Sequence, residues 1–300
     1  MKVFITGATG YIGFAVAQAF RRAGNEVHGL CRSPEKAKAL RREEILPVVG
    51  DLAKPESYAE AAAECAVLVH AAADMAKGMV GPDKLALETL LGAGGRGARP
   101  KTLVYTSGVW VYGTTGDRAV DETTPLRPLP IVAWRPGHEQ MVLGASSVRG
   151  LVLRPGCVYG KSGGMTASWF EAAGRKDLSL VGDGTNRWAM VHVDDLADAY
   201  VRAADSGLSG EVFNVTDRSR ATLREMATAA AKAAGFVGEI RLVPVAEASK
   251  TMGPFAEALA IDQHVESWKL ARRLGWHPRH GGFVDGVGSY HEAWKASAGS

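Results

Sequence analysis

The sequence predicts an α/β fold, in which a doubly wound parallel sheet carries a small C-terminal lobe. Short apolar segments with strand character alternate with helical patterns through the first half of the chain. A glycine-rich segment, Thr6–Gly13, separates the first strand from the first helix. Because strands that alternate with helices pair in parallel through right-handed crossovers, these two observations favour a doubly wound sheet.

The first half supplies five strands and four helices in regular alternation. Ser33 is expected to cap the second helix, with Pro34 at its first position, and the glycines between Gly92 and Pro100 are expected to end the fourth. The expected strands are Lys2–Ile5, Val27–Cys31, Leu46–Val49, Val67–Ala71 and Thr102–Thr106. The expected helices are Phe14–Arg22, Pro34–Arg42, Pro55–Glu64 and Pro82–Leu91.

The second half is less regular. Thr114–Val132 is rich in proline and polar residues and predicts a loop, as does Gly160–Gly164. Thr222 is a candidate cap for the helix that follows it. The expected strands are Leu151–Leu153, Trp188–Val193, Val212–Val215 and Ile240–Val245; the expected helices are Gly137–Ala145, Asp194–Ala204 and Leu223–Ala234, with a mostly helical remainder.

Composition and charge exclude several classes of protein. With 300 residues, 46% apolar content and a net charge of +3, the chain has the profile of a globular enzyme without a basic nucleic-acid-binding surface. Its cysteines, Cys31, Cys65 and Cys157, lack the spacing of a disulfide framework or a metal site. No apolar stretch is long enough to cross a membrane, and the motif at Thr6 leaves no room for a signal peptide. We therefore expect a cytoplasmic protein.

The glycines of the first turn predict a binding site for the pyrophosphate of a dinucleotide. Gly7 allows a tight turn after the strand, Gly10 leaves room for phosphate beside the backbone, and Gly13 lets the helix pack closely on the strand. The helix N-terminus adds N–H donors and a partial positive charge. Other cofactor contacts expected in this segment are Thr9, Tyr11 and Ile12.

The ends of the following strands should face the same ligand. Arg32 follows the second strand, where an arginine accommodates a 2′-phosphate, so NADP is favoured over NAD. Asp51, before Leu52, could accept from the adenine amino group or could cap the next helix. The small residues Ala71, Ala72 and Ala73 suit close contact with a flat cofactor.

Several segments together resemble the extended short-chain dehydrogenase/reductase superfamily, in its NAD(P)-dependent epimerase/dehydratase group. This resemblance implies a Rossmann fold, a nicotinamide cofactor, a C-terminal lobe for a small-molecule substrate, and a homodimer formed through the helices Pro82–Leu91 and Gly137–Ala145. The motifs that carry it are Thr6–Gly13, Gly50–Leu52, His70–Ala73, Thr106–Gly108, Val111–Gly113, Arg154–Gly160, His192–Ala197 and Leu274–Pro278.

The resemblance also divides the chain and adds cofactor contacts. Residues 1–160 with about 188–216 are expected to form the dinucleotide-binding domain, and 161–187 with about 217–300 the substrate lobe. Pro155 and Gly156 are expected against the nicotinamide ribose, with Val158, Thr106 and Ser107 as further contacts.

The chain departs from this family at the catalytic motif. The family uses a hydroxyl residue, a tyrosine, and a lysine four positions after the tyrosine. The hydroxyl position corresponds to Gly108, one residue after Ser107, and no tyrosine occurs between Tyr112 and Tyr159. Two alignments remain open: Trp134 and His138 replace the tyrosine and lysine, or Ile131 and Arg135 do.

The candidate catalytic residues are therefore His138, Ser107, Arg135 and Trp134. His138 is the first choice because imidazole titrates near neutrality. Trp110, Arg187 and Trp188 are candidate substrate contacts, each with core packing or surface exposure as its alternative. Asp194 and Asp195, after His192, are expected to cap a helix.

Three functions fit these residues. The first is an atypical NAD(P)-dependent oxidoreductase or epimerase-like enzyme that acts on a small carbonyl or sugar-like substrate. The second is an NADP-binding redox sensor without turnover, suggested by the missing motif. The third is a redox-neutral isomerase or lyase that retains its cofactor.

Overall fold

The computed structural model describes residues 1–73, 78–97, 100–161 and 163–298. The described chain forms two compact units. The first unit comprises Met1–Ser107, Trp134–Arg154 and Leu196–Phe213, and the second comprises Gly108–Ala133, Pro155–Asp195 and Asn214–Ser300. The assignment of cofactor and substrate to separate parts of the chain stays a prediction.

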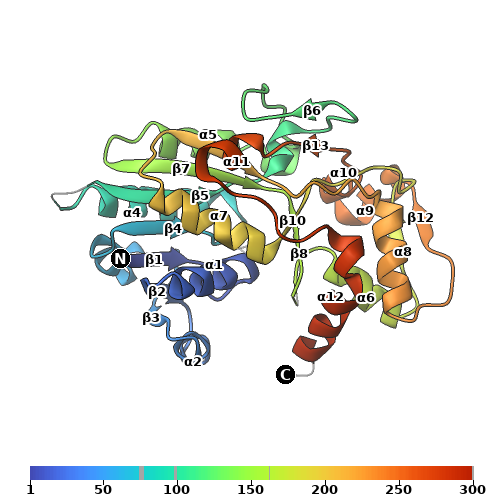
Figure 1. The fold of residues 1–300 in the computed structure, drawn as a ribbon, viewed down its shortest axis with the longest axis horizontal. Helices are drawn as coiled ribbons and strands as arrows, with labels where there is room; N and C mark the ends of the chain where they lie inside the picture. Colours follow the sequence, from blue (N-terminus) through green and yellow to red (C-terminus); the bar gives the residue numbers. More distant parts are fainter. Residues whose placement is uncertain (74–77, 98–99, 162, 299–300) are drawn as a thin grey trace. The chain divides into compact units, whose positions relative to one another are not determined.

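A seven-stranded sheet with the order β11-β7-β5-β4-β1-β2-β3 organises the first unit (Figure 1). Its first six strands in sequence pair in parallel. The predicted doubly wound parallel sheet is therefore confirmed. Its strands are β1 (Lys2–Thr6), β2 (Glu26–Cys31), β3 (Leu46–Val49), β4 (Val67–His70), β5 (Lys101–Thr106), β7 (Val148–Pro155) and β11 (Glu211–Val215).

Helices cover both faces of this sheet. On one face, alternate strand residues such as Phe4, Leu68 and Leu103 pack against α3 (Ala59–Ala63), α4 (Val80–Gly94) and α5 (Arg135–Leu143). On the other face lie α1 (Tyr11–Arg22) and α7 (Val193–Asp205), which Figure 1 shows in front of the strands. The alternation of strand side chains separates the two faces, since Tyr105 points to α4 whereas Thr106 contacts Tyr200 of α7.

The second unit contains three small two-stranded sheets and most of the remaining helices. Apolar side chains from α6 (Ala167–Gly174), α8 (Leu223–Ala233) and α12 (Phe283–Ala298) build its main core. Its parallel strand pairs are β8 (Cys157–Tyr159) with β10 (Met190–His192), β9 (Ser179–Val181) with β12 (Arg241–Val243), and β6 (Ala119–Val120) with β13 (His264–Val265). The other helices are α9 (Val245–Met252), α10 (Phe255–Leu259) and α11 (Trp268–Leu274).

The predicted caps form as expected at two helices. Ser33 accepts from the backbone N–H of Lys36 at the start of α2 (Pro34–Arg42). Thr222 and Glu225 form a reciprocal capping box at the start of α8. Both helices thus begin where a short hydroxyl side chain satisfies an otherwise unpaired N–H group.

The sequence analysis was wrong about several boundaries. Pro55–Glu64 is not one helix, because a 3₁₀ turn at Pro55–Ser57 precedes α3. α4 continues through Gly92 to Gly94, and residues 98 and 99 of the predicted break lie outside the described residues. β8, α6 and β9 were not predicted, and the predicted Trp188–Val193 strand is only Met190–His192. Of the predicted loop Gly160–Gly164, residue 162 lies outside the described residues.

Two features are absent from the described residues. In that part of the chain, no helix combines the length and apolar character needed to cross a bilayer. Nor does it contain a group of three histidine, cysteine or acidic side chains that could hold a metal ion.

Candidate active site

The glycine turn between β1 and α1 is closely packed against its surroundings. Gly7 has a φ of +73°, in the left-handed region that favours glycine, and a Cβ there would lie 2.6 Å from the carbonyl oxygen of Ala71. A Cβ on Gly13 would lie 2.2 Å from the carbonyl oxygen of Gly7. These two glycines therefore allow strand, turn and helix to approach one another.

Gly10 is less crowded than Gly7 and Gly13. A Cβ there would meet only the carbonyl oxygen of Gly7, at 3.3 Å. Gly10 is exposed and caps α1 without a side-chain hydrogen bond, and the first turn of α1 contains no acidic residue. This helix N-terminus thus has the open backbone and unopposed positive charge that a pyrophosphate requires. The cradle fits a dinucleotide.

The predicted contacts at the strand ends lie on one edge of the sheet. Because β1 to β5 are parallel, the residues that follow them share the carboxyl edge, where an open α/β sheet binds its ligand. Arg32 is exposed at this edge, and Ala71 and Ala72 are half-buried beside Gly7. The residues concerned are Gly7, Arg32, Asp51, Leu52, Ala71, Ala72, Ala73, Thr106 and Ser107.

The Asp51 carboxylate contributes to its own turn. Its Oδ1 accepts from the backbone N–H of Ala53 at 2.9 Å, just before the 3₁₀ turn at Pro55–Ser57. The capping alternative is wrong, because neither this 3₁₀ turn nor α3 has a side-chain cap, and the Asp51 bond stays within the preceding loop. A contact from Asp51 to an adenine ring stays a prediction.

A row of three polar side chains crosses the sheet beside the glycine turn. The strand register aligns Thr6 with His70 and His70 with Tyr105. Nδ1 of His70 lies 2.6 Å from the Thr6 hydroxyl, and the rings of His70 and Tyr105 stack with centroids 5.8 Å apart. All three are almost fully buried, on the sheet face that α4 and α5 cover.

Asp83, in the first turn of α4, joins this row to His138 of α5. Its Oδ1 lies 3.2 Å from Nε2 of His70, and its Oδ2 lies 2.6 Å from Nδ1 of His138 and 3.0 Å from the Tyr105 hydroxyl. Burial alone would raise the pKa of Asp83, but bonding and charge from His70, then His138 and Arg135, hold it below its usual range. Asp83 is therefore an ionised carboxylate between two imidazoles.

The other predicted residues of this segment pack around His138. The Trp134 ring meets the His138 ring edge-on, with centroids 4.8 Å apart. The Arg135 guanidinium lies 4.6 Å from the centre of the Trp134 ring and donates to the carbonyl oxygen of Thr106 at 2.8 Å. The first turn of α5 is thereby fastened to the end of β5.

Ser107 belongs to a separate buried group. Its hydroxyl donates to Oε1 of Glu139, and Arg154 donates to both carboxylate oxygens of that glutamate. Glu139 has no exposed surface, and Arg154 is 4% exposed. Because the hydroxyl proton of Ser107 bonds to Glu139, this side chain presents only lone pairs to a ligand.

Sequence reasoning missed Asp83 altogether and named His70 only as part of a motif. An acidic residue is common in the first turn of a helix, because the helix dipole favours negative charge there. The residue type alone therefore does not indicate a functional site. The available signal was a histidine at the carboxyl end of a buried strand, followed by an acid at the start of the next helix.

The remaining predicted contacts lie in the second unit. A Cβ on Gly156 would lie 2.5 Å from the carbonyl oxygen of Ala189, which explains this glycine by packing. Pro155 is buried, whereas Val158 is half-buried in β8. Their contacts with a cofactor stay predictions.

The predicted substrate residues have clear structural partners. Trp188 is 4% exposed, stacks on Trp169 and donates to the carbonyl oxygen of Leu259, so its ring belongs to the core. Trp110 is half-buried and meets the ring of Phe255 edge-on. Nη1 of Arg187 lies 3.3 Å from Oδ1 of Asp117. Their roles toward a substrate stay predictions.

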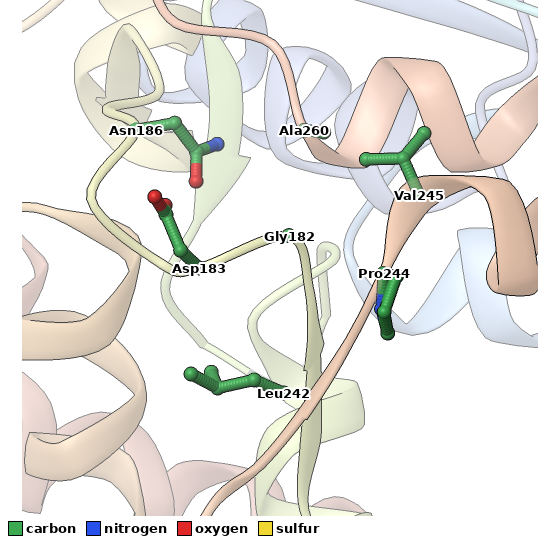
Figure 2. Close-up of a pocket in the computed structure, with 7 residues that line it drawn as sticks. All are labelled: Gly182, Asp183, Asn186, Leu242, Pro244, Val245 and Ala260. Atoms are coloured by element: carbon green, nitrogen blue, oxygen red, sulfur yellow. The ribbon is translucent and has the colours of Figure 1, made fainter.

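A pocket of about 480 Å³ opens in the second unit, within the segments expected to form the substrate lobe. Figure 2 shows the side chains of Asp183 and Asn186 on one side, opposite Val245 and Pro244. Asn186 is held by hydrogen bonds to the carbonyl oxygens of Leu259 and Ile261. The volume of this pocket suits a small ligand.

Asp195 bonds to a segment far along the chain, and the Asp194 carboxylate lies 2.7 Å from the ammonium group of Lys161. Oδ2 of Asp195 accepts from the backbone N–H groups of Arg279 and His280 and from the His280 ring, so it holds a distant segment. The rings of His192 and His280 stack with centroids 3.5 Å apart.

Comparison with known proteins supports the nucleotide cradle. The profile of the NAD dependent epimerase/dehydratase family matches residues 3–216. A quinoline-oxide ketoreductase of Stigmatella aurantiaca is 28% identical over 271 residues, which cover 86% of this chain and 80% of that protein. A 3-diazoavenalumate denitrifying reductase of a Streptomyces species is 28% identical, over 96% of this chain and 99% of that protein.

Solved structures share the fold across nearly the whole chain. The dTDP-glucose 4,6-dehydratase DesIV of Streptomyces venezuelae, with bound NAD, has a TM-score of 0.85 and 20% identity, covering 100% of this chain and 98% of that one. The human epimerase family protein SDR39U1, with NADPH, has a TM-score of 0.79 and 22% identity, covering 97% and 99%. The family profile and the cradle agree: this chain belongs to the NAD-dependent epimerase/dehydratase family and is an NAD(P)-dependent enzyme.

Proposed function

We propose that this chain is an NADP-dependent oxidoreductase that reduces a small carbonyl or sugar-like substrate, with His138 as the group that exchanges the proton. One observation carries the proposal. In the segment where the family's tyrosine and lysine are missing, His138 lies in the first turns of α5 and binds the buried Asp83 carboxylate through Nδ1. An imidazole held by a carboxylate is a recurring acid–base device.

The choice of NADP rests on Arg32. Its exposed side chain follows β2, and the adjacent Ser33 is engaged in capping α2. A guanidinium at this position pairs with a 2′-phosphate, whereas an acid there would bind the 2′-hydroxyl of NAD.

The proposed reduction transfers a hydride and a proton to the carbonyl group of the substrate. When bound, the reduced nicotinamide supplies a hydride to the carbonyl carbon of the substrate. Nε2 of a protonated His138 gives its proton to the carbonyl oxygen, which becomes the alcohol. His138 is then a neutral ring, still bound to Asp83 through Nδ1, and it regains a proton from water. The substrate thus gains a hydride and a proton, and with them two electrons.

The neighbouring residues have supporting roles in this proposal. Arg135 fixes the first turn of α5 to the end of β5 and places positive charge near Asp83. Trp134 packs on the imidazole and excludes water from that side. Ser107 offers lone pairs toward the ligand rather than a proton.

The names of two relatives, a ketoreductase and a denitrifying reductase, favour reduction of a small molecule. Several solved neighbours carry sugar nucleotides in their names, which keeps a sugar-like carbonyl substrate within the proposal. A homodimer through α4 and α5, a cytoplasmic location and the substrate-binding role of the second unit remain predictions.

The test mixes the protein and NADPH with a panel of aliphatic, aromatic and sugar-derived carbonyl compounds, and follows NADPH absorbance and product formation. We expect loss of absorbance with at least one compound, together with the matching alcohol. NADPH binding without turnover of any compound would instead favour the sensor. Product formation without net NADPH oxidation would favour a redox-neutral isomerase or lyase.

A further inference from the structure

The Asp83 carboxylate lies at the centre of a buried cluster of hydrogen bonds. An ionised carboxylate can only accept hydrogen bonds. Asp83 therefore accepts hydrogen bonds from the Tyr105 hydroxyl, Nε2 of His70 and Nδ1 of His138, at 3.0, 3.2 and 2.6 Å. Both histidines must carry a proton on the nitrogen that faces Asp83.

The bond on the far side of His70 agrees with this arrangement. A neutral His70 with its proton on Nε2 has a lone pair on Nδ1, which lies 2.6 Å from the Thr6 hydroxyl. The Thr6 hydroxyl can donate to that lone pair, and the carbonyl oxygen of Val69, at 3.4 Å, is its other acceptor. The Asp83 carboxylate thus has three buried side-chain donors, from His70, Tyr105 and His138.

His138 is left with one nitrogen outside this network. Its Nδ1 bonds to Asp83 and its ring packs edge-on against Trp134. No described residue forms a hydrogen bond to its Nε2. With the proton fixed on Nδ1, this second nitrogen carries the lone pair of the neutral ring. It is the atom free to take up and release a proton.

We propose that Asp83 is a positioning residue, which fixes His138 in the Nδ1–H tautomer so that Nε2 exchanges the proton with substrate; this rests on the proposed function. Asp83 is buried in the first turn of α4, where the helix dipole stabilises its negative charge. Its position is held from two sides, by β4 and β5 through His70 and Tyr105. Its carboxylate therefore presents a fixed acceptor to the imidazole.

The test reads the tautomer directly in the protein without cofactor. Long-range proton–nitrogen NMR correlations of a ¹⁵N-histidine sample distinguish Nδ1–H from Nε2–H, with His138→Gln used to assign the signals. At neutral pH we expect His138 as the Nδ1–H form. A wild-type ring in the Nε2–H form, or averaging between both forms, would overturn the proposal.

Two variants separate Asp83 from its surroundings. Asp83→Leu keeps the branched side-chain shape but removes the acceptor, so His138 should lose its preference for Nδ1–H. Tyr105→Phe removes another donor to the same oxygen and retains the carboxylate, so the Nδ1–H form should persist. An unchanged tautomer in Asp83→Leu would contradict the proposal. If that variant does not fold, the wild-type spectrum still decides the question.

A kinetic measurement ties the tautomer to turnover. With a substrate found in the carbonyl panel, Asp83→Leu should lower kcat by about 10²-fold to 10⁴-fold, while the KM for NADPH is retained. Unchanged kcat would overturn the positioning role. Absence of turnover in the wild-type protein would refute the proposed function alone, because the tautomer measurement does not require substrate.

Discussion

Glu139 and Arg154 form a buried ion pair in which the guanidinium donates from two nitrogens to the two carboxylate oxygens, with Ser107 as a third donor. The pair joins α5 to β7 and so holds the helix that carries His138. Removal of one partner would leave the other charge buried without compensation.

Replacement of Glu139 by alanine is therefore expected to lower the free energy of unfolding by about 3–5 kcal/mol, because Arg154 stays buried as an unpaired cation. Urea unfolding, followed by circular dichroism, measures the loss. A double replacement of Glu139 and Arg154 by methionine is the matched control and should recover most of it. A double variant as unstable as Glu139→Ala would show that lost packing, not the uncompensated charge, causes the effect.

Gly10 and Gly13 should respond differently to the same added methyl group. The extended backbone of Gly10, with φ −89° and ψ 171°, is open to alanine, and its Cβ would enter the space assigned to pyrophosphate. Gly10→Ala should thus retain thermal stability but weaken NADPH binding by about tenfold or more. Calorimetric titration and thermal unfolding measure the two effects.

Gly13→Ala is the comparison for this experiment. Its Cβ would lie 2.2 Å from the carbonyl oxygen of Gly7, which is backbone and cannot rotate away. We expect it to lower the free energy of unfolding by about 1–3 kcal/mol. Equal NADPH affinity in wild type and Gly10→Ala would argue against phosphate at this turn.

Arg32 should determine the preference between the two dinucleotides. Arg32→Ala is expected to weaken NADPH binding by about tenfold to hundredfold, since a charged hydrogen bond contributes about 1.5–3 kcal/mol. NADH affinity should stay the same, because NADH lacks the 2′-phosphate. Parallel titrations with both dinucleotides provide the comparison, and equal losses for the two would refute the assignment.

The lowered pKa of His192 predicts that the protein loses stability in acid. Burial first, and then the charge of the stacked His280, lower the pKa of His192 from 6.5 to about 4. The folded protein therefore keeps His192 neutral, so its contribution is complete above the unfolded pKa and is lost as the pH falls from 6.5 to about 4.

The measurement compares wild type with His192→Asn, in which the amide oxygen can replace Nδ1 as the acceptor for the Asp194 N–H group. Between about pH 8 and about pH 5, wild type should lose about 2 kcal/mol of unfolding free energy relative to the variant. Identical pH dependence in both proteins would rule out a lowered pKa at His192.

The sequence predicted the parts of this fold that depend on local pattern. Neighbouring residues alone determine the turn from Gly7 to Gly13, the positions of the five strand ends and the Thr222 cap. Hydrophobic periodicity and turn chemistry therefore predicted these features. The short strands β8 and β9 were not, because each exists through pairing with a remote segment, β10 and β12. A three-residue strand carries too little pattern to be recognised alone.

The candidate site shows the same distinction. His138 was predicted because it lies in the segment where the family's tyrosine and lysine are missing, and Arg32 because it follows a predicted strand. Asp83 was not found, since it is 13 residues from His70 and 55 from His138 and only the packing of α4 and α5 against the sheet brings these side chains together. The structure shows that Asp83 is the hydrogen-bond partner of His138.

A comparison of wild type with His138→Gln, in NADPH binding and in single-turnover reduction of a carbonyl substrate found in the panel, tests the assignment of His138 as proton donor in an NADPH-dependent reduction. We predict that both proteins bind NADPH with the same affinity, while the variant reduces the substrate about 10²-fold to 10⁴-fold more slowly. Equal rates in the two proteins, or a wild-type protein that does not bind NADPH, would contradict it.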